Sequence, residues 1–524
     1  MNRRILLACV VILVAIAGCV PEKYQWSPDG QTMTVLSNDG LRFADPDGKL
    51  QPAMLPGVSL VSWFPDSHRI LVGRAVSPAT WADLVQYLTP EQIQDVTTAA
   101  GHARDFAMQY DWTKVEGENW SWSSFAAELK NNEEKSGRDT TIYDSLGGAV
   151  ATCFRDHRDA ALTQKIPAAR WDDLANIDQD VFVVEVDTVH PDAIETGPRL
   201  MTSLRGACEL RVSPKGQAAI VVIPADKDDQ GDQPCELWVA ATDASRPPIE
   251  ISTHCAWYPD WTADGRDVVF VQTTDEHPHK GDTWLGSIDS IQVVGDDGKL
   301  MKNIPPPAAT QPAGASVADD PDRLGSPTEL AGLICNPFTR VRCLADGRIF
   351  FACVQVTLPA TGDDFPQHAE IFSINPGKEA TVSRVLTRNA VENMGDAAQY
   401  FEVSPDAKYI SVPDHSGKVT VVDLAGGNVM SVQPNAIPPN PGEGDNLTLP
   451  SVPTWRGPDE LTFVAPNYTK GLPPYLFLYN VAAYTGADSV KPKVLSVTWP
   501  DSIMKDENGI QPSTQPSTQP ATAP

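Results

Sequence analysis

Two histidines separated by a single residue form the most metal-like pattern in the chain. His277 and His279 occupy a short segment that also contains Asp275, Glu276 and Asp282. Imidazole and carboxylate groups are common ligands of divalent metals. Histidines in a short polar segment are more often solvated, so we predict that the chain holds no metal. His277 and His279 remain the candidate ligands for the alternative, a site for a transition metal.

A second cluster consists of four aspartates, Asp226, Asp228, Asp229 and Asp232. Carboxylate oxygens are the ligands that calcium prefers, and a calcium loop of the EF-hand type ends on an acidic residue at its twelfth position. Leu237 stands at that position in this chain. We therefore predict a solvated acidic loop at the surface rather than a calcium site.

The sequence lacks the pattern that marks a serine hydrolase. Gly-x-Ser-x-Gly, the turn that exposes the nucleophilic serine of α/β-hydrolases, does not occur. The chain also has no long alternation of strand-like and helix-like segments from which such a domain is built. We predict that the protein is not an enzyme, that it has no catalytic residue and that it uses no cofactor.

Besides Cys9 and Cys19 the chain has seven cysteines, and none of them belongs to a Cys-x-x-Cys motif. A redox motif or zinc ribbon therefore lacks its basic spacing. An odd number leaves at least one thiol unpaired, and the pairing of the others cannot be read from a sequence. We expect buried thiols, with disulfides allowed outside the cytoplasm. The seven are Cys153, Cys208, Cys235, Cys255, Cys335, Cys343 and Cys353.

The first residues are typical of a secretory signal. Arg3 and Arg4 precede an uncharged apolar stretch, residues 5–17, and small residues follow it. As a helix this stretch would rise only about 20 Å, against ~30 Å for the hydrocarbon core of a bilayer. A basic start with a short apolar stretch indicates a cleaved signal rather than a membrane span. We predict that residues 1–18 are a signal peptide.

The end of that stretch, Ile16-Ala17-Gly18-Cys19, resembles the lipobox of bacterial lipoproteins. The resemblance implies cleavage before Cys19 and attachment of a diacylglycerol to its sulfur. Two or three acyl chains, at ~0.8 kcal/mol per buried methylene, anchor a protein to a membrane permanently. Val20 follows the cysteine in place of the aspartate that retains many lipoproteins at the inner membrane. We therefore expect an exported protein of the cell envelope, anchored at the outer membrane.

The chain carries a formal net charge of −28, and removal of Arg3 and Arg4 with the signal would make it more negative. Nucleic acids and anionic lipids are polyanions that such a chain repels. We therefore expect no nucleic-acid partner, and we attribute contact with the membrane to the lipid anchor alone. The oligomeric state is left open.

A short turn pattern recurs seven times along the chain. It begins as Trp26-Ser27-Pro28-Asp29-Gly30 and continues at residues 63–67, 212–216, 261–265, 343–347, 403–407 and 455–459. Proline pre-sets φ for a turn and glycine accepts a positive φ, so each copy predicts a hairpin between flanking β-forming residues. The residues that carry the pattern are Trp26, Pro28, Asp29, Gly30, Trp63, Pro65, Asp66, Pro214, Gly216, Trp261, Asp264, Gly265, Asp346, Gly347, Pro405, Asp406 and Trp455.

Further strand candidates follow the hairpin in several repeats: residues 41–44 and 50–54, 288–294 and 300–304, and 418–423 and 429–432. Four antiparallel strands per repeat form the blade of a β-propeller. The Trp-Ser-Pro-Asp-Gly repeats resemble those of the TolB-like propellers. The resemblance implies an all-β propeller over residues 19–501, which we count as seven four-stranded blades, with six as the alternative.

The residues beyond a seven-bladed core are expected in insertions and in the tail. Residues 78–176 have helical periodicity and are predicted to form a helical insertion in blade 2. One helix is expected to begin at Thr89-Pro90 and to continue over 93–108, and another covers 141–164. Trp112, Trp120 and Trp122 lie between the helices. We expect them to hold the insertion to its scaffold, and the alternative is a cluster that binds sugars or peptides. Residues 305–336 read as a Pro/Ala-rich loop, and 502–524 as a disordered Pro/Ser/Thr/Gln tail.

Most of these additions fall between the second and third strands of a blade or between consecutive blades, and both kinds of connection emerge on one rim. Binding residues concentrate on loops of this kind. We predict a non-catalytic propeller scaffold that engages another envelope protein, as the TolB-like resemblance also implies. The alternatives are a carbohydrate-binding or carbohydrate-active propeller with groups at its central channel, and a sensor that depends on divalent cations.

Overall fold

A computed structural model describes most of the strands and helices of the chain. The residues that it describes are 24–37, 40–76, 78, 80–112, 122–168, 170–171, 183–190, 195–203, 207–222, 235–274, 284–302, 324–356, 367–375, 381–385, 400–413, 419–425, 429–432, 452–465, 475–481 and 493–495.

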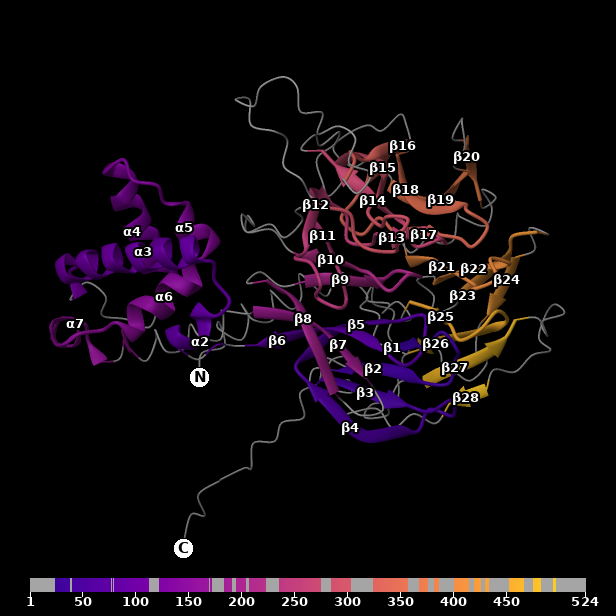
Figure 1. Cartoon of the computed structure of the whole chain (residues 1–524), viewed down its shortest axis with the longest axis horizontal. Coiled ribbons are helices and arrows are strands. Elements are labelled where there is room, and N and C mark those ends of the chain that lie inside the picture. Colours follow the sequence, from indigo (N-terminus) through magenta and orange to yellow (C-terminus); the bar gives the residue numbers. More distant parts are fainter. Residues whose placement is uncertain are drawn as a thin grey trace, which may run out of the picture. The chain divides into compact units, whose positions relative to one another are not determined.

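The strands form antiparallel meanders of four, in chain order (Figure 1). Meander 1 is β1 (Tyr24–Trp26), β2 (Met33–Ser37), β3 (Gly40–Ala44) and β4 (Leu50–Pro56). Meander 2 is β5 (Val58–Trp63), β6 (Ile70–Val76), β7 (Val183–His190) and β8 (Glu195–Ser203). Meander 3 is β9 (Ala207–Val212), β10 (Ala218–Val222), β11 (Cys235–Ala240) and β12 (Ile249–Cys255). Meander 4 is β13 (Asp260–Trp261), β14 (Asp267–Thr273), β15 (Trp284–Gln292) and β16 (Thr328–Cys335).

The remaining strands continue this arrangement. Meander 5 is β17 (Val341–Cys343), β18 (Ile349–Val356), β19 (Gln367–Asn375) and β20 (Thr381–Arg384). Meander 6 is β21 (Glu402–Val403), β22 (Tyr409–Pro413), β23 (Val419–Asp423) and β24 (Val429–Val432). Meander 7 is β25 (Thr454–Trp455), β26 (Glu460–Ala465), β27 (Tyr475–Asn480) and β28 (Lys493–Leu495). Meanders 3 and 4 share one sheet because Cys255 of β12 pairs with Gln272 of β14. The expectation of a mainly β architecture is confirmed.

The recurring turn joins the first two strands of each meander. In meander 1 the Gly30 N–H donates to the Ser27 carbonyl (2.8 Å), and the Ser27 N–H donates to the Thr32 carbonyl (2.7 Å). The Asp29 carboxylate accepts from the Ser27 hydroxyl at 2.6 Å and holds the turn from inside. The residue that closes the turn has a positive φ in six meanders, at Gly30, Ser67, Gly216, Gly265, Gly347 and Ala407. This left-handed conformation explains the recurring glycine.

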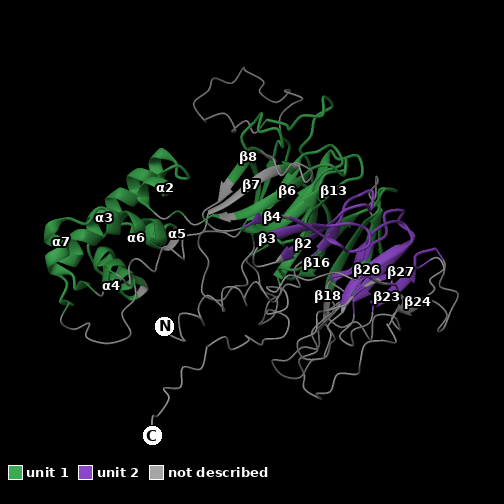
Figure 2. Ribbon diagram, turned by 90° about the horizontal axis from the view of Figure 1, so that it is seen from below, with its two compact units in different colours: residues 1–16, 57–385 green, residues 17–56, 386–524 purple. Residues whose placement is uncertain are grey.

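The chain divides into two compact units (Figure 2). Unit 1 comprises residues 1–16 and 57–385, and unit 2 comprises residues 17–56 and 386–524. In unit 1 consecutive meanders bury apolar side chains against each other. Phe64 of meander 2 packs with Leu210 and Ile220 of meander 3, and Val269 of meander 4 packs with Phe351 of meander 5. Side chains from two neighbouring sheets therefore form a shared core, as in stacked repeats.

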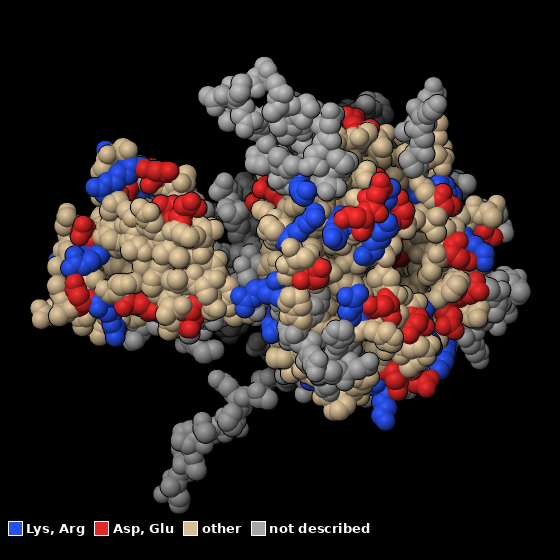
Figure 3. All heavy atoms as spheres, viewed as in Figure 1, with Lys and Arg blue, Asp and Glu red and all other residues tan. Residues whose placement is uncertain are grey.

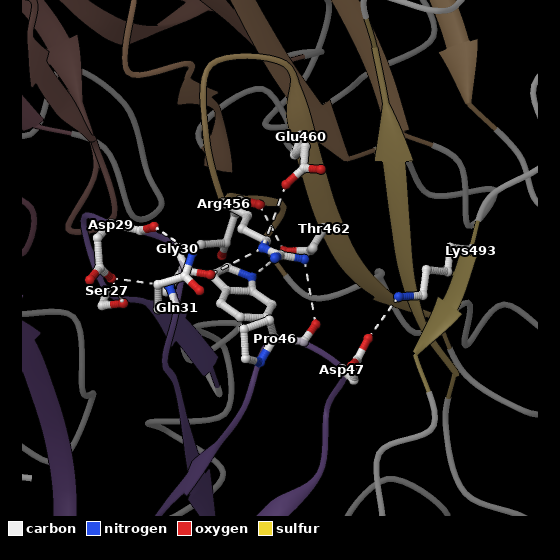
Figure 4. A network of polar contacts seen from close by, with 12 residues as sticks. Ser27, Asp29, Gly30, Gln31, Pro46, Asp47, Arg456, Glu460, Thr462 and Lys493 are labelled. Carbon is white, nitrogen blue, oxygen red and sulfur yellow. Dashed lines mark hydrogen bonds and ion pairs between the residues drawn. The ribbon is translucent and has the colours of Figure 1, made fainter. Parts of the chain in front are cut away.

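In unit 2 the N-terminal sheet packs on the C-terminal one (Figure 4). The Trp26 indole N–H donates to Thr462 Oγ1 at 2.9 Å. The Arg456 guanidinium lies over the Trp26 ring, 5.1 Å from its centroid, and donates to the carbonyls of Gly30 (3.1 Å) and Pro46 (3.4 Å). Meanders 1 and 7 are thus neighbours although they stand at opposite ends of the chain.

Helices occupy the connection between β6 and β7 and gather into one body (Figure 1). They are α2 (Trp81–Val85), α3 (Pro90–Gln109), α4 (Trp122–Lys135), α5 (Thr141–Ser145), α6 (Gly147–Asp156) and α7 (Ala160–Lys165). Thr89 caps α3 in a reciprocal capping box with Gln92. The core of this body is Phe125, Leu129, Val150 and Phe154 with surrounding residues, all buried. These helices bury their apolar faces against each other and so have a core of their own.

Two details of the helical segment differ from the sequence prediction. The single helix expected over residues 141–164 is three shorter helices, because the chain leaves helical geometry at Leu146 and again between His157 and Asp159. Helix α4 was not foreseen, although Trp122, Phe125, Ala126 and Leu129 recur at helical spacing and face the core of the helical body. Trp120 lies outside the described residues.

The fourth strand of meander 4 also differs from the prediction. Residues 300–304 were expected to form it, but Leu300 makes only an isolated bridge with Val294 across a tight turn. The strand is instead β16, which pairs along most of β15 and falls inside the segment 305–336 that we expected to be a loop. The third strand of meander 4 therefore ends, and the fourth begins, at the edge of the sheet that carries the recurring turn.

Among the residues that the structure describes, no helix is long and apolar enough to cross a membrane. The predicted signal peptide, Cys19 and the tail over residues 502–524 lie outside the described residues.

Candidate binding pocket in unit 1

A pocket of about 860 Å³ opens where meanders 4 and 5 meet, and we call it the seam pocket. Two recurring turns contribute to its lining, residues 262–264 of meander 4 and residues 344–347 of meander 5. The end of β15, the start of β16 and Met301 also line it. Its volume falls within the ~300–1,000 Å³ typical of ligand pockets.

Asp267 is the aspartate of the pocket whose pKa is raised rather than lowered. It is the first residue of β14 and is partly buried against the neighbouring turn. Burial raises the pKa of its carboxyl, and the nearby charge of Asp264 raises the pKa further. The Ser290 hydroxyl lies 3.5 Å from its Oδ2 and partly opposes the shift. A carboxyl of this kind holds its proton to higher pH and can donate a hydrogen bond or a proton.

The two turn aspartates behave differently from Asp267. Burial acts to raise the pKa of Asp264, but hydrogen bonds from the Thr262 hydroxyl and the Arg266 N–H outweigh it, and the pKa is lowered. Burial also acts to raise the pKa of Asp346, but its ion pair with Arg348 at 2.7 Å outweighs this effect, and the pKa is lowered. The pocket therefore presents two carboxyls with a lowered pKa, Asp264 and Asp346, and one with a raised pKa, Asp267.

Cys343 lies deeper, where β17 meets meander 4. Burial raises the pKa of its thiol well above the ordinary value, and the charges of Asp260 and Asp267 add to the effect. The backbone N–H of Cys343 donates to the Asp260 carboxylate at 2.9 Å and so fixes β17 against meander 4. The thiol is protonated at neutral pH, and its contribution to the pocket is shape rather than nucleophilicity.

The apolar part of the lining consists of Met301, Leu330, Leu344 and Ile349. Among the described residues that line the pocket there are three aspartates and no lysine or arginine. A ligand that fits this combination carries a cationic group close to an apolar one, since the carboxylates attract the charge and the floor buries the hydrocarbon. On the face of the molecule drawn in Figure 3, acidic and basic side chains are otherwise interspersed.

The sequence-predicted residues differ in where they lie in the structure. Asp264, Asp346 and Gly347 line the seam pocket. The repeat tryptophans Trp26, Trp63, Trp261 and Trp455 are at most 9% exposed and belong to the core, so their role is structural. Cys19, His277, His279 and the four aspartates of residues 226–232 lie outside the described residues. Among the residues that are described, no group of three or more His, Cys, Asp or Glu side chains is arranged to hold a metal ion.

Sequence reasoning missed the residues that complete the pocket, namely Asp267, Ser290, Gln292 and Thr328. Only their positions in the sequence could have indicated them. Asp267 comes two residues after a recurring turn, and the place of the others in the pocket depends on which strand pairs with β15. We expected the functional residues on the edge of the sheets where the second strand connects to the third. The seam pocket lies on the opposite edge, which carries the recurring turns. Residues 293–302 and 324–327 belong to the turn edge because β16 stands further along the chain than expected.

No protein-family model matches the chain, and the search of curated proteins finds no relative. Solved structures with a similar fold include the β-propeller domain of Cps50 (Swd1) from Myceliophthora thermophila, with 7% identity and a TM-score of 0.40 over 87% of this chain and 96% of that one. An oligogalacturonate lyase in complex with manganese has 11% identity and a TM-score of 0.36 over 78% and 75%. A putative TolB from Agrobacterium tumefaciens has 14% identity and a TM-score of 0.26 over 48% and 76%.

These comparisons contradict the prediction that the protein is not an enzyme. Besides the lyase, the similar structures include an acylaminoacyl peptidase from Pyrococcus horikoshii and a dihydro-heme d1 dehydrogenase, which are enzymes containing propellers. The missing Gly-x-Ser-x-Gly motif argued only against an attached hydrolase domain, and a propeller can itself carry catalytic groups. At these identities the likeness concerns the fold, and no substrate, ligand or partner is transferred from it.

Proposed function

We propose that the protein is an exported propeller scaffold that binds a cationic, partly apolar segment of a cell-envelope protein in the seam pocket. The single observation that carries the proposal is the pocket itself, which is lined by carboxylates and apolar side chains and, among the residues that the structure describes, by no basic residue. A lysine or arginine next to an aliphatic side chain satisfies both parts of the lining.

In this proposal the seven meanders are seven blades of one propeller. The support is that four-stranded meanders follow one another in both units and that meander 7 is joined to meander 1 by the contacts of Trp26 and Arg456.

The proposal also includes the lipid anchor. Its support is the sequence before Cys19, with its basic start, short apolar stretch and small residues. A Cys19→Ala variant tests it: the variant is expected in the soluble fraction after export, whereas the parent chain stays with the outer membrane. Membrane association unchanged by the substitution would contradict the anchor.

The Trp-rich helical segment gives no support to a sugar-binding function. Trp112 and Trp122 are 8% and 7% exposed, and both lie in the core of the helical body. The Trp112 indole N–H donates to the Ala107 carbonyl at 2.9 Å, and its ring stacks on Phe125. These rings are used to hold the helices together.

Binding to the pocket is tested with a fluorescent octapeptide of alternating arginine and leucine and with a counterpart of alternating glutamate and leucine. Fluorescence anisotropy is expected to detect binding of the first peptide alone, weakening as salt screens the carboxylates. Asp267→Asn is expected to weaken binding roughly threefold, about 0.6 kcal/mol. Thr328→Arg, which adds a positive charge at an exposed lining residue, is expected to weaken it more than about tenfold.

The matched control is Asp105→Asn, which removes the same charge from a side chain of the helical segment that is 73% exposed. It is expected to leave binding unchanged. Equal affinity for the two peptides would show that the carboxylates do not select a cationic ligand. Equal weakening by Asp105→Asn and Asp267→Asn would show that net charge rather than the pocket attracts the peptide. Either result would contradict the proposal.

A further inference from the structure

Three cysteines of meander 3 lie together at one end of the sheet. The Sγ atoms of Cys208 on β9 and Cys235 on β11 are 3.5 Å apart. Cys255, the last residue of β12, is the Cα partner of Cys235 in the strand pairing. Cys235 thus has a thiol neighbour on each side, one reached across the end of β10 and one on the adjacent strand.

An irregularity in the pairing of β9 brings Cys208 to Cys235. Glu209 pairs with Val221 and Ala207 pairs with Val222, so Cys208 is an extra residue with no partner position on β10. An extra residue of this kind bends the strand and redirects its side chains. The bulge comes where β10 ends, and the Cys208 side chain reaches Cys235 past the last residue of that strand.

We propose that Cys208 and Cys235 form a disulfide that links the first and third strands of meander 3. The sulfurs need to approach by only about 1.5 Å to reach the ~2.05 Å of a disulfide bond. The residues are 27 positions apart, so the bond closes a loop long enough to restrict the unfolded chain substantially.

The chemistry is exchange with a low-molecular-weight or protein disulfide as oxidant. The Cys208 thiol, which is partly exposed, loses its proton and attacks one sulfur of the oxidant, releasing the other sulfur as a thiolate. The Cys235 thiol then loses its proton and attacks Cys208 Sγ, and the second sulfur of the oxidant leaves. Two protons and two electrons pass from the cysteines to the oxidant, which becomes two thiols.

Cys255 is the competing partner, and its surroundings disfavour it. Its side chain is 0% exposed, so an oxidant does not reach it. Burial raises the pKa of its thiol well above the ordinary value, with the neighbouring Cys235 adding to the effect. A thiol in that state is a poor nucleophile for exchange. Cys235 is accordingly expected to pair with Cys208 and leave Cys255 reduced.

The test uses the folded chain from residue 20 onward, which removes Cys9 and Cys19 from the analysis and makes the result independent of export and anchoring. The protein is equilibrated with oxidised and reduced glutathione over a range of ratios, remaining thiols are alkylated, and peptides are mapped by mass spectrometry. We expect one Cys208–Cys235 linked peptide and the loss of two alkylatable thiols.

Three variants complete the test. Cys255→Ser is expected to keep the linked peptide, and Cys208→Ser is expected to lose it while Cys235 remains alkylatable. Cys153→Ser, in the helical segment, is the control for substitution of a buried thiol and is expected to change nothing. A Cys235–Cys255 link in the parent chain would overturn the proposal, as would a folded chain that keeps both thiols in fully oxidised glutathione.

Discussion

The residue that closes the recurring turn shows how strictly a single backbone angle is conserved within this chain. Glycine closes the turn in four meanders with a positive φ, and Ser67 and Ala407 occupy the same conformation at φ 61° and 57°. A side chain in this region costs roughly 1–2 kcal/mol. The two exceptions show that the turn tolerates that cost, because its hydrogen bonds are unchanged.

Gly265 and Gly216 separate this backbone cost from a steric one. A Cβ on Gly265 would lie 2.9 Å from the backbone nitrogen of Lys215 in the neighbouring meander, whereas a Cβ on Gly216 would meet nothing within 4 Å. We predict that Gly216→Ala lowers the free energy of unfolding by about 1 kcal/mol and that Gly265→Ala lowers it by at least twice as much. Urea denaturation measures both, and equal losses would show that the close approach is unimportant.

Asp267 gives a prediction about pH. Because the pKa of its carboxyl is raised by burial, ionisation of the carboxyl opposes folding, and stability falls as pH rises from the ordinary carboxyl range through the raised value. Asp267→Asn is therefore expected to raise the melting temperature at pH 7, with the gain disappearing below about pH 4.

Asp264→Asn provides the opposite case. The pKa of Asp264 is lowered, so its charge stabilises the fold above the ordinary carboxyl range and that contribution is lost as pH falls. The substitution should lower the melting temperature at pH 7. If both asparagine variants melt lower at pH 7 by the same amount, the assignment of the two carboxyls is wrong.

At the scale of elements, one arginine makes several of the polar contacts between meanders 1 and 7. The Arg456 side chain is 17% exposed, stacks on Trp26 and donates to two carbonyls of the N-terminal sheet (Figure 4). Lysine cannot reproduce a planar group with several donors. We predict that Arg456→Lys lowers the free energy of unfolding by about 1–2 kcal/mol.

The comparison for this contact is Lys493→Ala. Lys493 and Asp47 form an ion pair at 2.9 Å between the same two sheets, but the side chains are 58% and 81% exposed. Exposed pairs contribute roughly 0–1 kcal/mol. Chemical denaturation that ranked Lys493→Ala as the more damaging change would contradict this account of how the two sheets are joined.

The helical segment is expected to be removable. Val76 and Val183 are Cα partners at the ends of β6 and β7, so a short turn can join the two strands directly. The helices carry their own core. A chain in which a Gly-Asn-Gly linker replaces residues 77–182 should keep its strand-rich circular dichroism and cooperative unfolding, whereas loss of the folded sheets would show that the helices support them.

The sequence predicted elements where a local pattern determines them. The recurring turns are set by residues within five positions of each other, as in Ser27, Asp29 and Gly30, and they were located correctly. The fourth strand of meander 4 was misplaced because pairing with β15 is a long-range choice, and both 300–304 and β16 have β-forming residues. The pocket depended on that choice, so only its turn residues Asp264, Asp346 and Gly347 were identified in advance.

At the scale of the whole molecule, four-stranded meanders of the same topology follow one another along the chain, and the seam pocket lies between two of them. The recurring aspartate holds its turn in meander after meander, and in meanders 4 and 5 the same residue type also faces the seam pocket. The turn aspartates Asp264 and Asp346 thus serve both the turn and the candidate binding surface. Asp267 and Thr328, which belong to no motif, complete that surface.

Hydrogen–deuterium exchange of the full chain with and without the arginine–leucine octapeptide tests the central claim most directly, because it reports where the peptide binds. We predict slower exchange in peptic fragments that contain residues 262–267, 290–292 and 343–349, and no change in fragments of the helices α2–α7. Protection confined to the helices, or to strands remote from the seam between meanders 4 and 5, would contradict the seam pocket as the binding site.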